Sequence, residues 1–240
     1  MLPLDRQNWY RQRRRREQPG WQHSGDAFET LTRERLSPAS RVLDLGCGRG
    51  GVMELFWRDV RLAVGLDPDL LSLREHRAGM PLVCGLAEAL PFRAGSFNVV
   101  IGLWVLEHLA DPLAVLREIH RVLAPGGRFI FLTPNALHPL LLANRYAWAF
   151  PAIQRMLVPR LYGRSETDTF RVRYRANTPA RLRALAAETG FGVGSLRTIS
   201  DPTYLAFNDA FYRLSLLLEQ LLPRRAHVHI LGDFVREGLA

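Results

Sequence analysis

The residues of this chain best suited to chemistry are two aspartates on either side of a glycine-rich segment. Asp44 lies in an apolar run over residues 42–45, and glycines at positions 46, 48, 50 and 51 follow it directly. Glycine lets the backbone turn tightly and approach a ligand that side chains would block. Asp67 ends a second apolar run about 20 residues further on, the spacing of dinucleotide-binding sites. We therefore predict a nucleotide-cofactor site, with a helix over residues 52–60 whose N-terminus faces the turn.

The position of Asp44 distinguishes between two kinds of cofactor. The glycines at 46, 48 and 51 match the fingerprint of nicotinamide-dependent enzymes, so an oxidoreductase is one alternative. A carboxylate in the strand tip would repel the pyrophosphate of that cofactor, whereas it would attract the sulfonium and ammonium groups of S-adenosylmethionine. Asp44 therefore favours S-adenosylmethionine.

Five blocks of sequence between residues 41 and 135 agree with the second interpretation. In chain order they are VLDLGCGRG, VGLDPD, CGLAEALPF, SFNVVIGLWVLEH and REIHRVLAPGGRFIFLTPN. In order and spacing they resemble the class I S-adenosylmethionine-dependent methyltransferases, specifically the subgroup that modifies small molecules. The resemblance implies methyl transfer with S-adenosylmethionine as the cofactor. The cofactor-binding residues that it implies are Asp44, Gly46, Cys47, Gly48, Asp67, Pro68, Leu86, Ala87 and Leu103.

Several of these residues have more than one interpretation. Asp67 can accept hydrogen bonds from both ribose hydroxyls, although an aspartate before Pro68 is also a common turn composition. We interpret Cys47 as a small packing residue rather than a nucleophile. Leu86 and Asn98 depart from the family, in which these positions often carry aspartates. The departures leave a non-catalytic S-adenosylmethionine-binding adaptor as an alternative.

Candidate catalytic and substrate-binding residues lie where strands are expected to end. Methyl transfer is a direct displacement in which the enzyme aligns the acceptor and excludes water, and a base helps when the acceptor must lose a proton. His108, after the fourth expected strand, is the candidate base. We expect no metal site, because His227 and His229 alternate in the last strand without a third ligand. Candidate substrate residues are Trp21, His23, Asn135, His138, Tyr174 and Arg175.

Short apolar runs alternate with helical segments, which is the rhythm of a parallel sheet. The expected fold is α/β: a doubly wound, mostly parallel seven-stranded sheet, Rossmann-like as in class I methyltransferases, with helical cap insertions. Helices are predicted after the capping residues Asp111 and Thr178, the second ending at Gly190. Strands are predicted at residues 42–45, 63–66, 82–84, 99–103, 129–132, 193–199 and 228–234.

We expect one globular domain in four parts. Residues 1–40 form a basic segment and a helix folding over the core, and residues 41–135 form the cofactor-binding core. Residues 136–177 form a cap insertion, and residues 178–240 complete the sheet with a second insertion at 201–225. Both insertions are too long for simple connections and follow strands whose carboxyl ends face the ligand crevice.

The net charge of +9 raises nucleic acid or an anionic membrane as a partner. All 32 basic residues are arginine, which points to genome composition, and no RNA-binding module is recognisable around the arginines at 11–16. We expect an exposed helical or disordered terminus there, with RNA methylation as the alternative within the enzyme class. The expected partner is a small-molecule or lipid-like acceptor. Residues 140–158 and 214–222 are interpreted first as core or cap, then as contacts to a lipid-like substrate, and last as peripheral membrane contact.

The sequence has no recognisable signal peptide and no apolar run of transmembrane length, so we expect a cytoplasmic protein. Cysteines occur only at positions 47 and 84, which does not suggest a disulfide framework. The sequence identifies neither the acceptor nor the oligomeric state.

Overall fold

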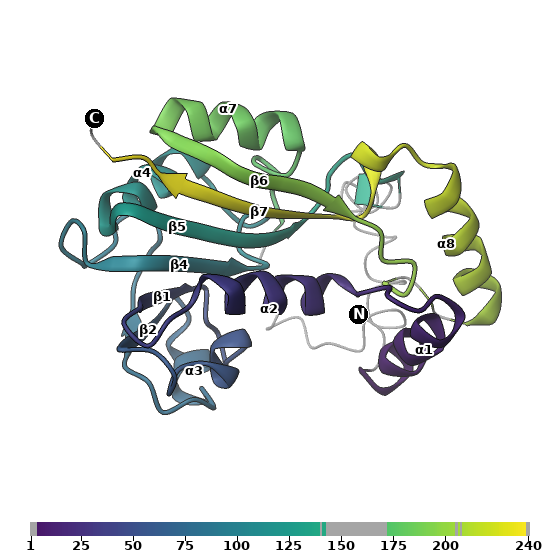
Figure 1. Cartoon of the computed structure of the whole chain (residues 1–240), viewed down its shortest axis with the longest axis horizontal. Coiled ribbons are helices and arrows are strands. Elements are labelled where there is room, and N and C mark those ends of the chain that lie inside the picture. Colours follow the sequence, from purple (N-terminus) through teal and green to yellow (C-terminus); the bar gives the residue numbers. More distant parts are fainter. Residues whose placement is uncertain (1–3, 140, 143–171, 205, 207, 239–240) are drawn as a thin grey trace.

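The computed structural model describes residues 4–139, 141–142, 172–204, 206 and 208–238. These residues form a seven-stranded sheet whose strands run parallel except for β7, which is antiparallel to both of its neighbours (Figure 1). The expected α/β fold is therefore confirmed. In spatial order the strands are β3 (Leu82–Cys84), β2 (Leu62–Asp67), β1 (Arg41–Leu45), β4 (Phe97–Leu103), β5 (Leu123–Pro134), β7 (His229–Arg236) and β6 (Phe191–Ile199).

Helices cover both faces of this sheet, as its buried parallel strands require. One face packs against α4 (Pro112–Val122) and α7 (Pro179–Thr189). The opposite face packs against α2 (Ser24–Arg35), the 3₁₀ turn η1 (Val52–Leu55) and α3 (Leu70–Arg74) (Figure 1). We call these the α4 face and the α2 face.

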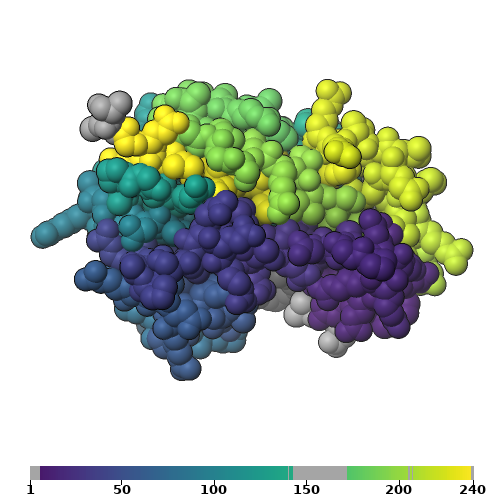
Figure 2. Space-filling view, viewed as in Figure 1, coloured from purple at the N-terminus to yellow at the C-terminus, as the bar shows by residue number. Residues whose placement is uncertain are grey.

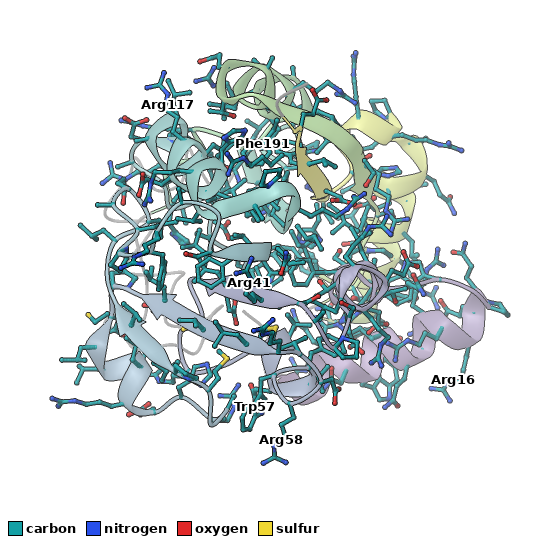
Figure 3. All side chains as sticks on the ribbon, turned by 60° about the vertical axis from the view of Figure 1, so that its left-hand side comes forward. Arg16, Arg41, Trp57, Arg58, Arg117 and Phe191 are labelled. Atoms are coloured by element: carbon teal, nitrogen blue, oxygen red, sulfur yellow. The ribbon has the colours of Figure 1, made fainter. Side chains whose placement is uncertain are left out.

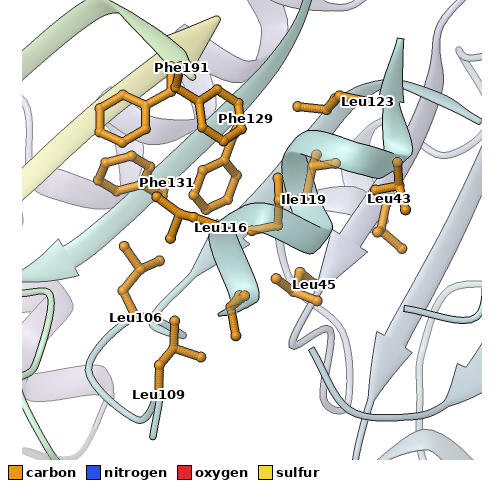
Figure 4. Close-up of a cluster of buried hydrophobic side chains, with 14 of the residues drawn as sticks. Leu43, Leu45, Leu106, Leu109, Leu116, Ile119, Leu123, Phe129, Phe131 and Phe191 are labelled. Carbon is orange, nitrogen blue, oxygen red and sulfur yellow. The ribbon is translucent and has the colours of Figure 1, made fainter. Parts of the chain in front are cut away.

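Alternation along each strand sends its side chains to the two faces in turn. In β1, Leu43 and Leu45 belong to the core on the α4 face, whereas Val42 belongs to the core on the α2 face. Figure 4 shows Leu43 and Leu45 packed beside Ile119 of α4. Asp44 lies between Leu43 and Leu45 in the strand, so its side chain is directed to the α2 face.

The two predicted helix caps are confirmed. The carboxylate of Asp111 accepts hydrogen bonds from the backbone N–H groups of Leu113 and Ala114 at the start of α4, both at 3.1 Å. The hydroxyl of Thr178 accepts from the N–H of Arg181 at the start of α7. Gly190 ends α7 with a φ of +77°, a left-handed conformation that glycine adopts without a side-chain clash.

The helix expected over residues 52–60 is wrong, because only η1 follows the glycine turn. Met53 and Phe56 are buried three residues apart, which suits a 3₁₀ turn, whereas Arg58 points into solvent (Figure 3). Gly51, immediately before η1, makes no side-chain cap. No long helix after Gly51 contributes its dipole to ligand binding.

The arginine-rich N-terminus forms a helix, α1 (Leu4–Glu17), that lies beside α8 (Asp209–Leu221) of the second expected insertion (Figures 1 and 2). A short 3₁₀ turn, η3 (Arg224–Ala226), follows α8 and leads to β7. Most of the first expected insertion, residues 136–177, lies outside the described residues. Among the helices of the described residues, none has both the length and the apolar character needed to cross a membrane.

Two tyrosines hold α1 and α8 together. The rings of Tyr10 and Tyr212 lie 5.2 Å apart between their centroids, and both side chains are buried. The hydroxyl of Tyr212 donates to Glu17 at 2.6 Å, and the hydroxyl of Tyr10 donates to Asp209 at 3.2 Å. The guanidinium of Arg13 also binds both of these carboxylates. Part of the arginine cluster therefore stabilises the fold.

Candidate functional site

The glycine turn joins the carboxyl ends of β1 and β2. The backbone N–H of Gly46 donates to the carbonyl of Leu66 at 2.7 Å, and the N–H of Gly48 donates to the carboxylate of Asp67 at 2.9 Å. Gly46, Gly48 and Gly50 have φ values of +71°, +48° and +116°, which disfavour other residues. The chain is thus held in a tight turn with its backbone open to a ligand.

Two buried carboxylates lie beside this turn. Asp44 and Asp67 are 5% and 6% exposed, and no cationic side chain among the described residues forms an ion pair with either. Burial, and secondly the carboxylate of Asp67, raises the pKa of Asp44 to about 7. Asp67 accepts a second backbone hydrogen bond, from Asp69 at 2.8 Å. A site with these two carboxylates suits a cationic ligand far better than a pyrophosphate.

The turn lies at the point where the strand order changes direction. From β1 the chain proceeds first outward through β2 and β3, and then to β4 on the other side of β1. In open α/β sheets the ligand crevice lies outside the carboxyl ends of the strands at this point. Leu103 ends β4 there, and Trp104 follows it with a left-handed φ of +60°.

Apolar side chains stand exposed on the β2–β3 side of the turn. Leu86, after β3, is 60% exposed, and Leu70 and Leu71, at the start of α3, are 50% and 65% exposed. Ala87 packs against the α4-face core, and the carbonyl of Pro68 accepts a weak bond from the thiol of Cys84 at 3.6 Å. These leucines leave apolar surface exposed just after the carboxyl ends of the paired strands β2 and β3. Sequence reasoning missed Leu70 and Leu71, which directly follow the Asp-Pro-Asp turn.

The thiol of Cys47 is buried in the turn. Burial raises the pKa of Cys47 to about 12, so the thiol is protonated at neutral pH. Its sulfur fills the space that a side chain at Gly65 would need, 2.7 Å from the position of a Cβ atom there. This geometry agrees with a packing role and not with a nucleophile.

The segment after β4 is fastened to the core by Glu107. Burial raises the pKa of Glu107 to about 7, and Thr133 donates a hydrogen bond to its carboxylate at 3.0 Å. The backbone carbonyl of Glu107 accepts from the N–H groups of Arg173 and Tyr174. The ring of His108 lies 4.0 Å from the Glu107 carboxylate and is about a third exposed. The ring of His108 is therefore partly accessible to solvent.

Three of the expected substrate residues, Asn135, Tyr174 and Arg175, lie in the segments that connect strands and helices. Asn135 is buried, and its side-chain amide donates to the carbonyls of Arg225 and His227 at 2.9 and 2.8 Å. Its side-chain oxygen accepts from the backbone N–H of Leu137, so the amide holds the chain and does not face an acceptor. Arg175 is exposed and donates to the carbonyl of Ala110. Tyr174 is half-buried with a left-handed φ of +52°.

The other three lie towards the end of the sheet at β7. The indole N–H of Trp21 donates to the carbonyl of Ser200 at 3.4 Å, directly after β6. His23 caps α2 by accepting from the N–H of Asp26 at 2.9 Å. His138 is 2% exposed, and its Nε2 atom lies 3.4 Å from the carboxylate of Glu219 in α8. The fold thus brings His23 and His138 to one edge of the sheet.

His229 belongs to the same edge, and sequence reasoning assigned it no function. Its side chain is buried and contacts Ser24, which is 205 positions earlier in the chain. No group of three or more potential metal ligands occurs among the described residues. His229 contacts Trp104, directly after β4, only in the folded chain. No local pattern in the sequence predicts this contact.

Comparisons with known proteins agree with this architecture. A family described as a methyltransferase domain matches residues 43–131. The chain is 39% identical over 109 residues to malonyl-[acyl-carrier protein] O-methyltransferase of Herminiimonas arsenicoxydans, covering 43% of this chain and 41% of that one. It is 35% identical over 121 residues to ubiquinone biosynthesis O-methyltransferase of Ruegeria pomeroyi, covering 48% and 49%. The chain thus spans less than half the length of these curated relatives.

Solved structures share the fold over most of the chain. A chain of the complex containing the Haloferax volcanii Trm112 methyltransferase activator has a TM-score of 0.64 at 19% identity, covering 91% of both chains. Geranyl diphosphate C-methyltransferase of Streptomyces coelicolor, solved with S-adenosyl-L-homocysteine, has a TM-score of 0.59 at 15% identity and covers 88% and 80%. These likenesses and the sheet order show that the chain has the fold of class I S-adenosylmethionine-dependent methyltransferases, and its residues 43–131 match a methyltransferase domain.

Proposed function

We propose that this protein transfers the methyl group of S-adenosylmethionine to an O, N or C atom of a small or lipid-like acceptor. The observation that carries the proposal is the pair of buried carboxylates, Asp44 and Asp67, at the glycine turn. Relatives named as O-methyltransferases and a fold neighbour named as a C-methyltransferase support the reaction class.

In this proposal each end of the cofactor has its own contacts. The carboxylate of Asp67 accepts hydrogen bonds from the ribose hydroxyls, which are charge-assisted and therefore strong. Asp44 attracts the cationic part of the cofactor, and the backbone of Gly46 and Gly48 lies against it. The exposed leucines, with Leu86 first among them, cover the adenine ring.

The reaction requires no covalent enzyme intermediate. An electron pair of the acceptor, a lone pair on O or N or a π pair on C, attacks the methyl carbon, the new bond forms as the carbon–sulfur bond breaks, and the electron pair of that bond stays on sulfur. S-adenosylhomocysteine is the second product. An acceptor hydroxyl loses its proton in this step, and His108 is the proposed base because it lies in the segment that follows β4 and its ring is about a third exposed.

Calorimetry and a transfer assay test the proposal. We expect the purified protein to bind S-adenosylhomocysteine and to show no binding of NADH. Cell extract incubated with the protein and methyl-labelled S-adenosylmethionine should yield labelled small molecules. Binding of NADH alone would support the oxidoreductase alternative, and cofactor binding without any labelled product would support the adaptor.

Asn98, which stands where relatives often carry an aspartate, gives little support to the alternative of a non-catalytic adaptor. The side-chain oxygen of Asn98 accepts from the backbone N–H of Arg41 at 3.1 Å, at the amino ends of β1 and β4. This is the edge of the sheet opposite the glycine turn. The departure at Leu86 removes a charged contact to adenine and leaves an apolar one, which lowers affinity without touching the reacting atoms.

A second proposal, peripheral contact with an anionic membrane, rests on α8. One side of α8 carries four exposed apolar residues, Phe211, Leu214, Leu217 and Leu221, which are 48% to 73% exposed. Tyr212 and Ser215 are buried on the other side. Arginines are exposed at positions 213, 224 and 225, in α8 and η3. An apolar stripe flanked by arginines suits an anionic lipid surface.

Vesicle flotation tests this contact. Phosphatidylglycerol vesicles should carry the wild type upward at moderate salt, and phosphatidylcholine vesicles should not. The double substitution Leu214→Gln and Leu217→Gln should abolish flotation, whereas Leu62→Gln, at an exposed leucine on β2, should not. Equal flotation of all three proteins, or none with the wild type, would remove the membrane contact.

A further inference from the structure

A buried histidine at the carboxyl edge of the sheet has no part in the site at the glycine turn. His229, the first residue of β7, is 1% exposed. Its Nδ1 atom lies 2.6 Å from the hydroxyl of Ser24 in α2, whereas its buried Nε2 atom has no hydrogen-bond partner among the residues that the structure describes. Buried polar atoms in folded proteins are nearly always paired, so an unpaired one requires a functional or structural explanation.

The ring of His229 lies between two aromatic side chains. Its centroid is 4.8 Å from that of Trp104, which directly follows β4, and 4.8 Å from that of Tyr204, which lies between β6 and α8. The backbone N–H of Trp104 donates to the carbonyl of Leu132 in β5, which fixes this aromatic contact against the sheet. The imidazole therefore has one nitrogen bonded to Ser24, one buried nitrogen without a partner among the described residues, and two aromatic neighbours.

His229 shares a face and an edge of the sheet with the carboxylate that we assign to the cofactor. Ile230 faces the α4-face core and Leu231 the α2-face core, so His229 is directed to the α2 face, as Asp44 is in β1. Both residues lie at the carboxyl edge of the parallel strands. The order β1-β4-β5-β7 separates them by three strand spacings, about 14 Å. The segment directly after β4 lies between Asp44 and His229, since its Trp104 contacts His229 and its Val105 lies against Gly46.

Further unpaired polar atoms lie nearby. His138 and Glu219 contact each other, yet within the described part of the chain the Nδ1 atom of His138 and one carboxylate oxygen of Glu219 have no partner. Both residues and Tyr204 line a small cavity with room for about one water molecule. Tyr204 thus separates the cavity from the ring of His229 and contacts both.

We propose that His229 binds the methyl acceptor, pairing its buried, unpartnered Nε2 atom with a hydroxyl group of the acceptor. This inference rests on the proposed function and specifies its acceptor. Ser24 fixes the orientation of the ring, and Trp104 and Tyr204 favour a flat, apolar acceptor body. Burial lowers the pKa of His229 to about 3, with smaller effects of His138, His23 and Arg11, so the imidazole is neutral at physiological pH. A neutral imidazole selects a neutral hydroxyl, such as that of a phenol, over a carboxylate.

Nuclear magnetic resonance of protein with ¹⁵N-labelled histidine tests the assignment. The protein is saturated with S-adenosylhomocysteine, and phenol, catechol or benzoate is then titrated. We expect phenol and catechol to shift the ring nitrogen resonances of His229, and benzoate to leave them unchanged. The resonances are identified by their loss in His229→Gln. The matched control is His227→Gln, two residues earlier, in which the shifts of His229 should persist.

Calorimetry separates this inference from the function on which it rests. His229→Gln and His227→Gln should both bind S-adenosylhomocysteine within about twofold of the wild type, because neither residue touches the glycine turn. A wild type that does not bind this ligand would overturn the proposed function and the assignment together. Normal binding, with His229 resonances that neither phenol nor catechol moves, would overturn the assignment alone.

A milder variant provides a test in case His229→Gln does not fold. Ser24→Ala keeps the imidazole and removes only the hydroxyl that holds Nδ1. Losing this one positioning bond should weaken catechol binding by about threefold to tenfold. An unchanged catechol affinity in Ser24→Ala would contradict the proposed orientation of the ring, and the wild-type titration decides the assignment in either case.

Discussion

The carboxylate of Asp67 accepts a hydrogen bond from the backbone N–H of Gly48 over 2.9 Å, so the end of β2 holds the glycine turn that follows β1. Its other oxygen accepts from the N–H of Asp69 at 2.8 Å. Each carboxylate oxygen retains a free lone pair beyond these bonds. Asp67 therefore can shape the turn and still receive two ribose hydroxyls.

Two substitutions of Asp67 separate its contact with the glycine turn from its proposed contact with the ribose. Asp67→Ala should weaken S-adenosylhomocysteine binding tenfold or more, because it removes charge-assisted hydrogen bonds to the ribose. Asp67→Asn keeps one oxygen for the turn but loses the charge, so we expect an intermediate loss. Isothermal titration calorimetry measures both.

Asp69→Asn is the control for this pair, because Asp69 is half-buried and its carboxylate caps α3. Its affinity should stay within about twofold of the wild type. An affinity of Asp67→Ala equal to that of Asp69→Asn would refute the ribose contact.

Asp44 should make cofactor binding depend on pH. Its pKa of about 7 in the ligand-free protein means that binding a cation requires loss of a proton below pH 7. The affinity for S-adenosylmethionine should therefore rise about tenfold between pH 6 and pH 8. Asp44→Asn should bind more weakly and lose most of this dependence, which titrations at the two pH values would reveal.

The same residue should affect the stability of the ligand-free protein in the opposite direction. The folded-state pKa of Asp44 lies above its value in the unfolded chain, so its ionisation removes stability as pH rises from about 4 to about 7. Asp44→Asn should gain stability relative to the wild type over this window. Glu107 also has a raised pKa, so the difference between the two proteins is the informative quantity. A constant difference from pH 4 to 8 in urea unfolding would contradict the shift.

Gly46 should tolerate substitution less well than Gly48 in the same turn. A Cβ atom there would lie 2.5 Å from a methyl group of Val105, and φ is +71°. Gly48 has a φ of +48° but open space around it, so Gly48→Ala should cost only the backbone strain, about 1 to 2 kcal/mol. Gly46→Ala adds a clash, for a total of about 2 to 5 kcal/mol.

A double-mutant cycle isolates the clash at Gly46. Val105→Ala should relieve part of the cost of Gly46→Ala and none of the cost of Gly48→Ala, as measured by chemical unfolding. Equal costs of the two glycine substitutions would mean that Val105 moves freely and that the post-β4 segment does not press on the turn.

Much of the sheet could be predicted, because each strand is an apolar run bounded by turn residues. The prediction failed where two local patterns compete. Residues 123–128 contain Pro-Gly-Gly, which is typical of a turn, yet β5 begins at Leu123 because this residue pairs with Phe97 before a register shift. The segment after Gly51 has helical composition, yet Met53 and Phe56 favour a single 3₁₀ turn by burying together.

The site could be predicted only where its residues are close in sequence. Asp44 and the glycines are adjacent, and the carboxylate of Asp67 follows at a known spacing. Asn135 could not be distinguished from a substrate ligand, since its two carbonyl partners are 90 and 92 positions away. The contact between Ser24 and His229 depends on α2 crossing β7, which no single element of the sequence encodes.

The N-terminal helix should behave as part of the fold, and Tyr212→Phe tests this directly. The hydroxyl of Tyr212 donates to Glu17 at 2.6 Å, and its removal leaves that carboxylate with Arg13 alone. We expect a loss of about 1 kcal/mol, which for a chain of this size lowers the melting temperature by about 2 to 4 °C. Tyr10→Phe is the matched control, because its bond to Asp209 is longer at 3.2 Å and should cost less. If both substitutions leave thermal unfolding unchanged, α1 is not docked on α8 in solution, and its arginines are free to act as the nucleic-acid-binding arm that the docked helix argues against.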